Sequence, residues 1–99
     1  MHKFTELDIQ PHITSTSPKW NFNGKDIGRE YSFNTYLNSI EFVNAIGIVA
    51  EAMNHHPVIQ ISWGKVLVQV HTDSVDGISL LDFKLAARLD KFYLLHYDL

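Results

Sequence analysis

The sequence has 99 residues, a formal net charge of −3 at pH 7 and no cysteine. With 45% hydrophobic and 19% charged residues it can fill one small core, so we expect a single folded domain over residues 1–99 rather than a disordered chain. The acidic balance argues against direct nucleic-acid binding, the lack of cysteine excludes disulfides and cysteine-based zinc sites, and no run reaches the roughly 18 apolar residues of a membrane span.

The amino-terminal region carries the weakest structural signals. Its first six residues contain no apolar stretch typical of a signal peptide, which favours a cytoplasmic protein. Thr5 to Asp8 is compatible with the start of a helical turn, but Pro11 limits that turn because proline lacks a backbone N–H. Residues 14–18 have the composition of a loop.

A hairpin and a helix are predicted next. Residues 20–22 and 27–33 flank Asn23-Gly24, a strong signal for a tight turn between antiparallel strands. In the second arm apolar and polar residues alternate, as in a strand with one buried face. A pattern of apolar residues at steps of three and four then predicts a helix over residues 35–54.

The second half of the chain repeats this order. Residues 59–63 and 65–71 alternate apolar and polar side chains, which predicts a second hairpin. Ser79 and Asp82 have the spacing of a capping box and open a second helix. The expected fold is therefore α+β, a four-stranded antiparallel sheet with two helices packed on one face. The apolar stripe of the second helix comprises Leu81, Leu85, Leu89 and Phe92.

Three side chains that can bind or release protons, Glu51, His55 and His56, lie around the junction between the first predicted helix and the strand that follows it. Pro57 is expected to end the helix, which places His55 in its last turn and Glu51 four residues earlier on the same face. His56 is expected to leave the helix. Imidazole is the side chain whose ordinary pKa lies nearest neutral pH, so this junction is suited to general acid–base catalysis.

This junction resembles a known signature. The pattern Glu51-x-x-x-His55-His56-Pro57-x5-Trp63 is similar to that of the pterin-4a-carbinolamine dehydratases. The resemblance extends over about residues 20–90, with blocks in the same order and spacing. These further blocks are Trp20, Ile27-x-Arg29-x-Tyr31-x-Phe33, Lys65-Val66, Gly77-Ile78-Ser79-x-x-Asp82 and Leu85-Ala86.

The resemblance implies an architecture and an assembly. Members of the family have the α+β fold inferred above, usually with an additional amino-terminal helix. Because Pro11 and the loop at residues 14–18 occupy its place, we expect that helix to be shortened or absent here. Members form dimers or tetramers in which sheets join across subunits, so a homodimer or homotetramer is expected.

The resemblance also implies a reaction. The family removes water from 4a-hydroxytetrahydrobiopterin to give quinonoid dihydropterin, without a metal or an organic cofactor. By resemblance, His55 and His56 bind the pterin and carry protons, and Glu51 orients His55. The other positions implied as substrate-binding or supporting are Pro57, Trp63, His71, Thr72 and Asp82.

One position departs from the family pattern. The family places a histidine, occasionally a tryptophan, ten residues after the aromatic at Trp63, and this chain has Asp73 there. His71 lies two residues earlier, and positions two apart in a strand face the same side. We therefore expect His71 or Asp73 to supply a third catalytic group beside the two histidines of the junction.

Several alternatives stay open at the level of sequence. One histidine of the pair can cap the helix while the other is an incidental surface residue, and Asp82 is better explained as a cap than as a catalyst. The histidines with Asp73 could in principle bind a metal, although adjacent histidines rarely share one ion. The rival to the enzyme is a pterin-binding or protein-interaction module that has lost catalysis; some animal members of the family assist a transcription factor.

Overall fold

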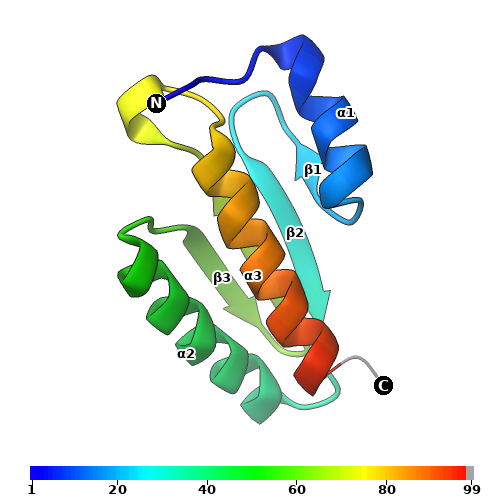
Figure 1. Cartoon of the computed structure of the whole chain (residues 1–99). Helices are drawn as coiled ribbons and strands as arrows, with labels where there is room; N and C mark the ends of the chain where they lie inside the picture. Colours follow the sequence, from blue (N-terminus) through cyan, green and yellow to red (C-terminus); the bar gives the residue numbers. More distant parts are fainter. Residues whose placement is uncertain (98–99) are drawn as a thin grey trace.

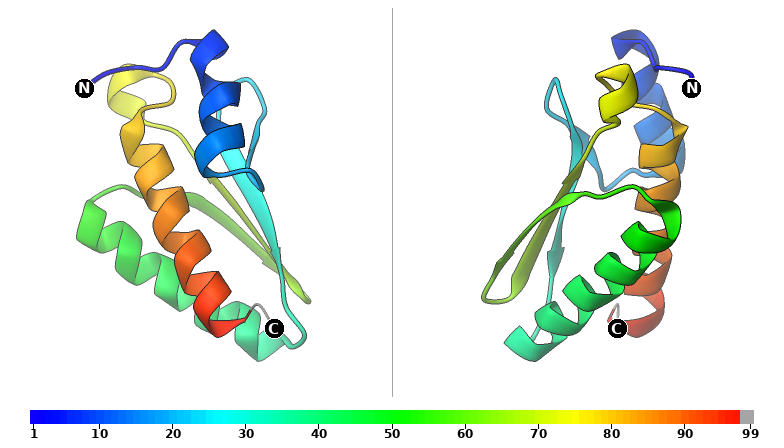
Figure 2. Two further views of the ribbon diagram at one scale, coloured as in Figure 1. Left: turned by 45° about the vertical axis from the view of Figure 1, so that its right-hand side comes forward. Right: turned by 90° about the vertical axis from the view of Figure 1, so that its left-hand side faces the viewer.

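The computed structural model describes residues 1–97, which form one sheet covered on one face by helices (Figures 1 and 2). Among these residues, no helix is long and apolar enough to cross a membrane. The helices are α1 (Glu6–Thr16), α2 (Tyr36–Met53) and α3 (Leu80–His96). The strands are β1 (Asn21–Phe22), β2 (Ile27–Ser32), β3 (Val58–Ser62) and β4 (Lys65–Val70), and a 3₁₀ turn spans Asp73–Val75.

The sheet is antiparallel throughout, with the strand order β1-β2-β4-β3. Both predicted hairpins are present. Strands β2 and β4 pair with each other at the centre of the sheet. Val66, Val68 and Val70 of β4 point into the core and are buried, as the alternation predicts. Because β3 lies at the edge, one side of this strand has no strand partner among residues 1–97.

The amino-terminal helix is present, so the expectation that it is shortened or absent is wrong. Helix α1 runs for 11 residues with Pro11 inside it. Proline in a helix interior costs about 3 kcal/mol, but Pro11 is exposed and removes only its own N–H. Ile9 and Ile13, four residues apart, are both buried in the core, which contributes about 1.5–3 kcal/mol each. Tertiary burial therefore outweighs the local penalty.

Helix α1 also explains an apolar residue outside the stripe of the last helix. Phe83 of α3 is buried, with its ring centroid 5.2 Å from that of Phe4 and 4.2 Å from that of His12. The amino-terminal segment thus covers a side chain that would otherwise be exposed. The capping box that begins α3 is formed as predicted, since Ser79 and Asp82 satisfy each other's backbone N–H groups.

Candidate active site

The histidine pair lies just beyond the end of α2, and a left-handed residue separates it from the helix. The helix ends at Met53, and Asn54 has φ 49° and ψ 45°. The predicted end near residue 54 is confirmed, but the expectation that His55 lies in the last turn of the helix is wrong. The left-handed residue turns the chain, and His55 faces inward and is buried while His56 stays exposed.

His55 belongs to a buried polar network centred on Asp82. Its Nε2 lies 2.6 Å from Asp82 Oδ1. Thr72 donates its hydroxyl to Asp82 Oδ2 at 2.8 Å, and the backbone N–H of Ser79 donates to the same oxygen at 2.9 Å. Asp82 is therefore both the helix cap that the sequence predicts and the partner of a site histidine, which the sequence analysis did not foresee.

The network determines which nitrogen of His55 is available. An ionised Asp82 can only accept hydrogen bonds, so His55 Nε2 donates and Nδ1 is the acceptor of the ring. Within residues 1–97 no hydrogen bond to Nδ1 is formed, and no buried side-chain nitrogen or oxygen lacks a partner, so Nδ1 reaches solvent. His55 can thus accept a proton at Nδ1.

Glu51 pairs with the other histidine. Its Oε1 lies 2.7 Å from His56 Nε2, so the expectation that Glu51 orients His55 is not met. The physical reason is the turn at Asn54, which carries His56 back over the last turn of α2. Both side chains are exposed, and such a pair contributes only about 0–1 kcal/mol to stability.

His71 lies between two carboxylates just after β4. Its Nδ1 is 2.6 Å from Asp26 Oδ1, and its Nε2 is 2.6 Å from Asp73 Oδ1. Partial burial lowers the pKa of His71, but the hydrogen bonds and negative charges of Asp26 and Asp73 outweigh burial, and the net pKa is raised above 6.5. Asp26 was missed by the sequence analysis because it is 45 residues away in the chain.

Strand register places His56 and His71 on the same face of the sheet. Val58 pairs with Gln69, and continuing this register by two residues brings His56 opposite His71. Position 55 then lies opposite position 72, and His55 and Thr72 do contact the same carboxylate. The carboxylate that these two inward residues share is consistent with this extension, which would set His56 and His71 across from each other on the outer face.

Trp63 and Pro57 are at opposite ends of β3. The strand rises about 3.3 Å per residue, so six residues separate them by about 20 Å. Trp63 is 75% exposed at the turn of the second hairpin, and within one chain it does not join the histidines. Trp20 is buried and donates its indole N–H to Asp90, so it is a core residue.

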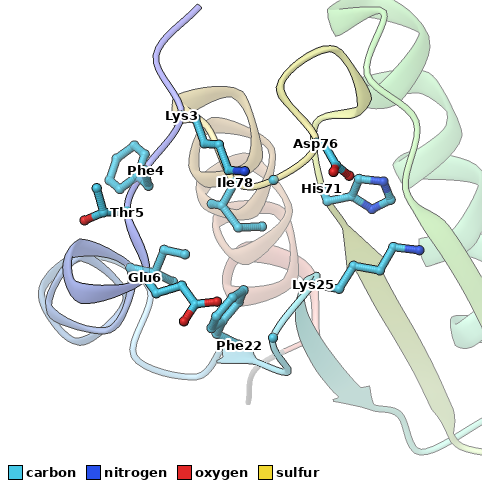
Figure 3. A pocket seen from close by; sticks show the side chains of 12 residues that line it. Lys3, Phe4, Thr5, Glu6, Phe22, Lys25, His71, Asp76 and Ile78 are labelled. Atoms are coloured by element: carbon cyan, nitrogen blue, oxygen red, sulfur yellow. The ribbon is translucent and has the colours of Figure 1, made fainter.

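A cavity of about 310 Å³ lies beside the segment that follows β4. Figure 3 shows it between the amino-terminal residues Lys3 and Glu6, Phe22 of the first hairpin, and Ile78. His71 forms part of its wall, whereas His55 and His56 do not line it. The histidine pair therefore lies outside this cavity, and His71 is the one site histidine in its wall. No group of three or more histidine, aspartate or glutamate residues in positions 1–97 is arranged to hold a metal ion.

Comparison with known proteins points in one direction. The family model described as "Pterin 4 alpha carbinolamine dehydratase" matches residues 2–92. A relative from Alkaliphilus metalliredigens, named "Putative pterin-4-alpha-carbinolamine dehydratase", is 35% identical over 85 residues, which cover 85% of this chain and 77% of the relative. A relative of the same name from Picosynechococcus is 36% identical over 89 residues, 90% of this chain and 96% of the relative.

Solved structures share the fold. A transcriptional coactivator/pterin dehydratase from Brucella melitensis superposes with a TM-score of 0.83 at 24% identity, covering 91% of this chain and 97% of the other. A pterin dehydratase-like protein identified as a RuBisCO assembly factor in the alpha-carboxysome has a TM-score of 0.65 at 21% identity, covering 74% and 87%. At these identities the likeness establishes the architecture alone.

Proposed function

The chain belongs to the pterin-4a-carbinolamine dehydratase family, and we propose that it removes water from 4a-hydroxytetrahydrobiopterin to give quinonoid dihydropterin in pterin recycling. The observation that carries the proposal is the paired arrangement of His55 and His56, each held by its own carboxylate at the junction of α2 and β3. Two imidazoles with different partners can perform different proton transfers in one site.

The reaction needs both an acid and a base. The 4a-hydroxyl is a poor leaving group unless it is protonated, and a ring nitrogen must lose its proton to complete the double bond. His55, with Nε2 bound to Asp82 and Nδ1 open, suits the base, while His56 or His71 on the outer face suits the acid. General acid–base catalysis of this kind contributes about 10²–10⁴-fold.

The proposal is tested by following decay of freshly generated 4a-hydroxytetrahydropterin with and without the purified protein. We expect the protein to accelerate decay above the spontaneous rate, with no added metal or cofactor. Decay at the spontaneous rate across pH 6–8 would refute the proposal that this protein is a dehydratase.

A second function is a binding module of the same fold without turnover. Two observations favour it: Asp73 occupies the position where the family has histidine, and a neighbour of the same fold is described as an assembly factor. Calorimetric titration with a stable dihydropterin, together with the decay assay, separates the two functions. Binding of the pterin without accelerated decay supports the binding module. Calorimetry is preferable to tryptophan fluorescence because Trp20 is buried and Trp63 lies at the far end of β3.

Restoring the family residue at position 73 is expected to raise turnover. In Asp73→His an imidazole would stand at the position where the family has one, next to Thr72 at the end of the sheet where His55 contacts Asp82. We expect the rate to increase about tenfold, the low end of the range for one acid–base group. Asp73→Asn, which removes the charge without adding an imidazole, is the matched control; an increase in Asp73→Asn equal to that in Asp73→His would contradict the prediction.

A homo-oligomer is expected in solution. Leu37 is 74% exposed and Ile48 is 72% exposed, and their spacing of three helical turns places them on one face of α2. The edge strand β3 adds exposed Val58 and Trp63. Light scattering should report a mass of at least twice the 11.4 kDa of the chain.

The contribution of α2 to assembly can be isolated. A double variant, Leu37→Glu with Ile48→Glu, should dissociate an oligomer that uses this face, because two charges would be buried in the contact. Leu7→Glu on α1 is the control, since Leu7 is equally apolar and exposed but belongs to another surface. A monomeric parent at micromolar concentration would refute the oligomer.

A further inference from the structure

We propose that His71 is the third acid–base group of the site and that Asp26, from the first hairpin, is its positioning residue. This inference rests on the proposed dehydratase function. It assigns a role to Asp26, a residue to which neither the motif nor the strand patterns point.

Hydrogen bonds within the first hairpin hold the backbone of Asp26, the residue whose carboxylate contacts His71. The side-chain oxygen of Asn23 accepts hydrogen bonds from the backbone N–H of Lys25 at 2.9 Å and of Asp26 at 2.7 Å. The backbone N–H of Asn23 in turn donates to the carbonyl of Asp26 at 3.0 Å. The side chain of Asp26 is only 19% exposed, so the hairpin presents a carboxylate that is fixed in position and largely shielded from water.

The two partners of His71 differ in exposure. Both ring nitrogens face carboxylates, which only accept hydrogen bonds when ionised, so both nitrogens donate and the ring is an imidazolium. Asp26 at Nδ1 is shielded, whereas the side chain of Asp73 at Nε2 is 96% exposed. An exposed pair is easily exchanged for another acceptor, so a substrate can displace Asp73 from Nε2 while Asp26 keeps Nδ1.

This arrangement gives an aspartate–histidine dyad whose reactive nitrogen faces outward. Extended by two residues beyond its last pair, Val58 and Gln69, the register of β3 and β4 would set His71 across from His56 on the outer face of the sheet. Asp26 holds the ring and stabilises its positive charge, as a shielded carboxylate does for a catalytic imidazole. Asp73, being in water, offers a path for a new proton to reach His71 after each turnover.

The proton balance of the step closes without any co-reactant. His71 Nε2 gives its proton to the 4a-hydroxyl oxygen while the carbon–oxygen bond breaks and its electron pair stays on oxygen, releasing water. The lone pair of the neighbouring ring nitrogen forms the carbon–nitrogen double bond, and the proton of that nitrogen passes to His55 Nδ1. One proton is donated and one is accepted, and nothing is oxidised or reduced.

Other charged groups surround His71 and must be separated from the effect of Asp26. Lys25 of the hairpin and Lys3 of the amino-terminal segment line the same cavity and oppose a positive ring, whereas Glu6 and Asp76 favour it. Figure 3 shows these side chains around the cavity. Asp76 provides the matched control, because it is an aspartate on the same wall without a hydrogen bond to His71 within residues 1–97.

The test measures the protonation of His71 and turnover in Asp26→Asn. In the parent, nitrogen-detected NMR should report both ring nitrogens of His71 protonated at neutral pH. In Asp26→Asn we expect the His71 titration midpoint to move toward acid. Turnover should fall about tenfold at pH 8, the effect of one charged hydrogen bond, and much less at pH 6, where the imidazolium persists. Asp76→Asn, which removes a charge but no hydrogen bond to His71, should keep the parent turnover and move the His71 midpoint much less than Asp26→Asn does.

Two results would overturn the inference. One is a His71 midpoint that does not move in Asp26→Asn; the other is an equal loss of turnover at pH 6 and pH 8, which a purely structural role predicts. A parent protein that does not accelerate dehydration would instead refute the proposed function. The NMR titration would then still decide by itself whether Asp26 controls the protonation of His71.

Discussion

His56→Ala is expected to reduce the dehydration rate about 100-fold or more while leaving the fold intact. His56 is exposed and its only side-chain hydrogen bond within residues 1–97 is to exposed Glu51, so its removal costs at most about 1 kcal/mol of stability. In the proposed function His56 binds the pterin beside the donor His71 and the acceptor His55, and a misplacement of the substrate by about 1 Å can cost about 10²-fold. The rate should be measured with saturating substrate, and the melting temperature recorded for the same sample.

The control for this substitution is His2→Ala, which removes an exposed histidine of the amino-terminal segment. Its turnover and melting temperature should both equal those of the parent. If His56→Ala keeps the parent rate, the junction histidine takes no part in the chemistry, and the dyad of His71 with Asp26 would have to act with His55 alone.

Asp82→Ala is expected to produce the largest loss of stability, about 2–5 kcal/mol, from a buried donor left unpaired and a weakened helix cap. Asp82 is fully buried and accepts hydrogen bonds from His55, Thr72 and the backbone N–H of Ser79. Its removal deletes the half of the capping box that accepts from the Ser79 N–H and leaves the buried His55 Nε2–H without its acceptor, while Thr72 keeps Ser79 Oγ at 2.7 Å. For a domain of this size, such a loss lowers the melting temperature by roughly 20 °C.

The free energy of unfolding of Asp82→Ala can be measured by urea denaturation followed by circular dichroism. Asp76→Asn is the matched control, since Asp76 is exposed and asparagine tolerates its left-handed backbone at φ 49°. A loss below 1 kcal/mol in Asp82→Ala would mean that the buried network contributes little and that His55 finds another partner. Activity is a second readout, because His55 without Asp82 loses the hydrogen bond that leaves Nδ1 as the acceptor.

Much of the fold follows from local patterns in the sequence. The hairpins follow from alternation and from Asn23-Gly24, and the last helix follows from its capping box and apolar stripe. These features depend on residues within a few positions of one another, where backbone geometry and burial of one face are decided. The histidine pair was recognised for the same reason, since its motif is continuous in the chain.

The contacts between the site residues depended on the tertiary structure. The left-handed conformation of Asn54 decides that Glu51 meets His56 rather than His55. Asparagine after a helix is a known signal for this conformation, but the signal does not say which histidine reaches Glu51. The partner of His55 is 27 residues away and that of His71 is 45 residues away, so each contact exists only once the sheet and the helices have packed.

The amino-terminal helix α1 also depends on tertiary contacts rather than on local sequence pattern. By itself, Pro11 argues against a helix, because it removes an N–H from the helix interior. The helix forms because Ile9 and Ile13 bury against the core, a stabilisation that appears only after the rest of the domain has provided a surface to cover. Local pattern thus determined which elements this protein has, while long-range burial and pairing determined the added helix and which carboxylate holds each histidine.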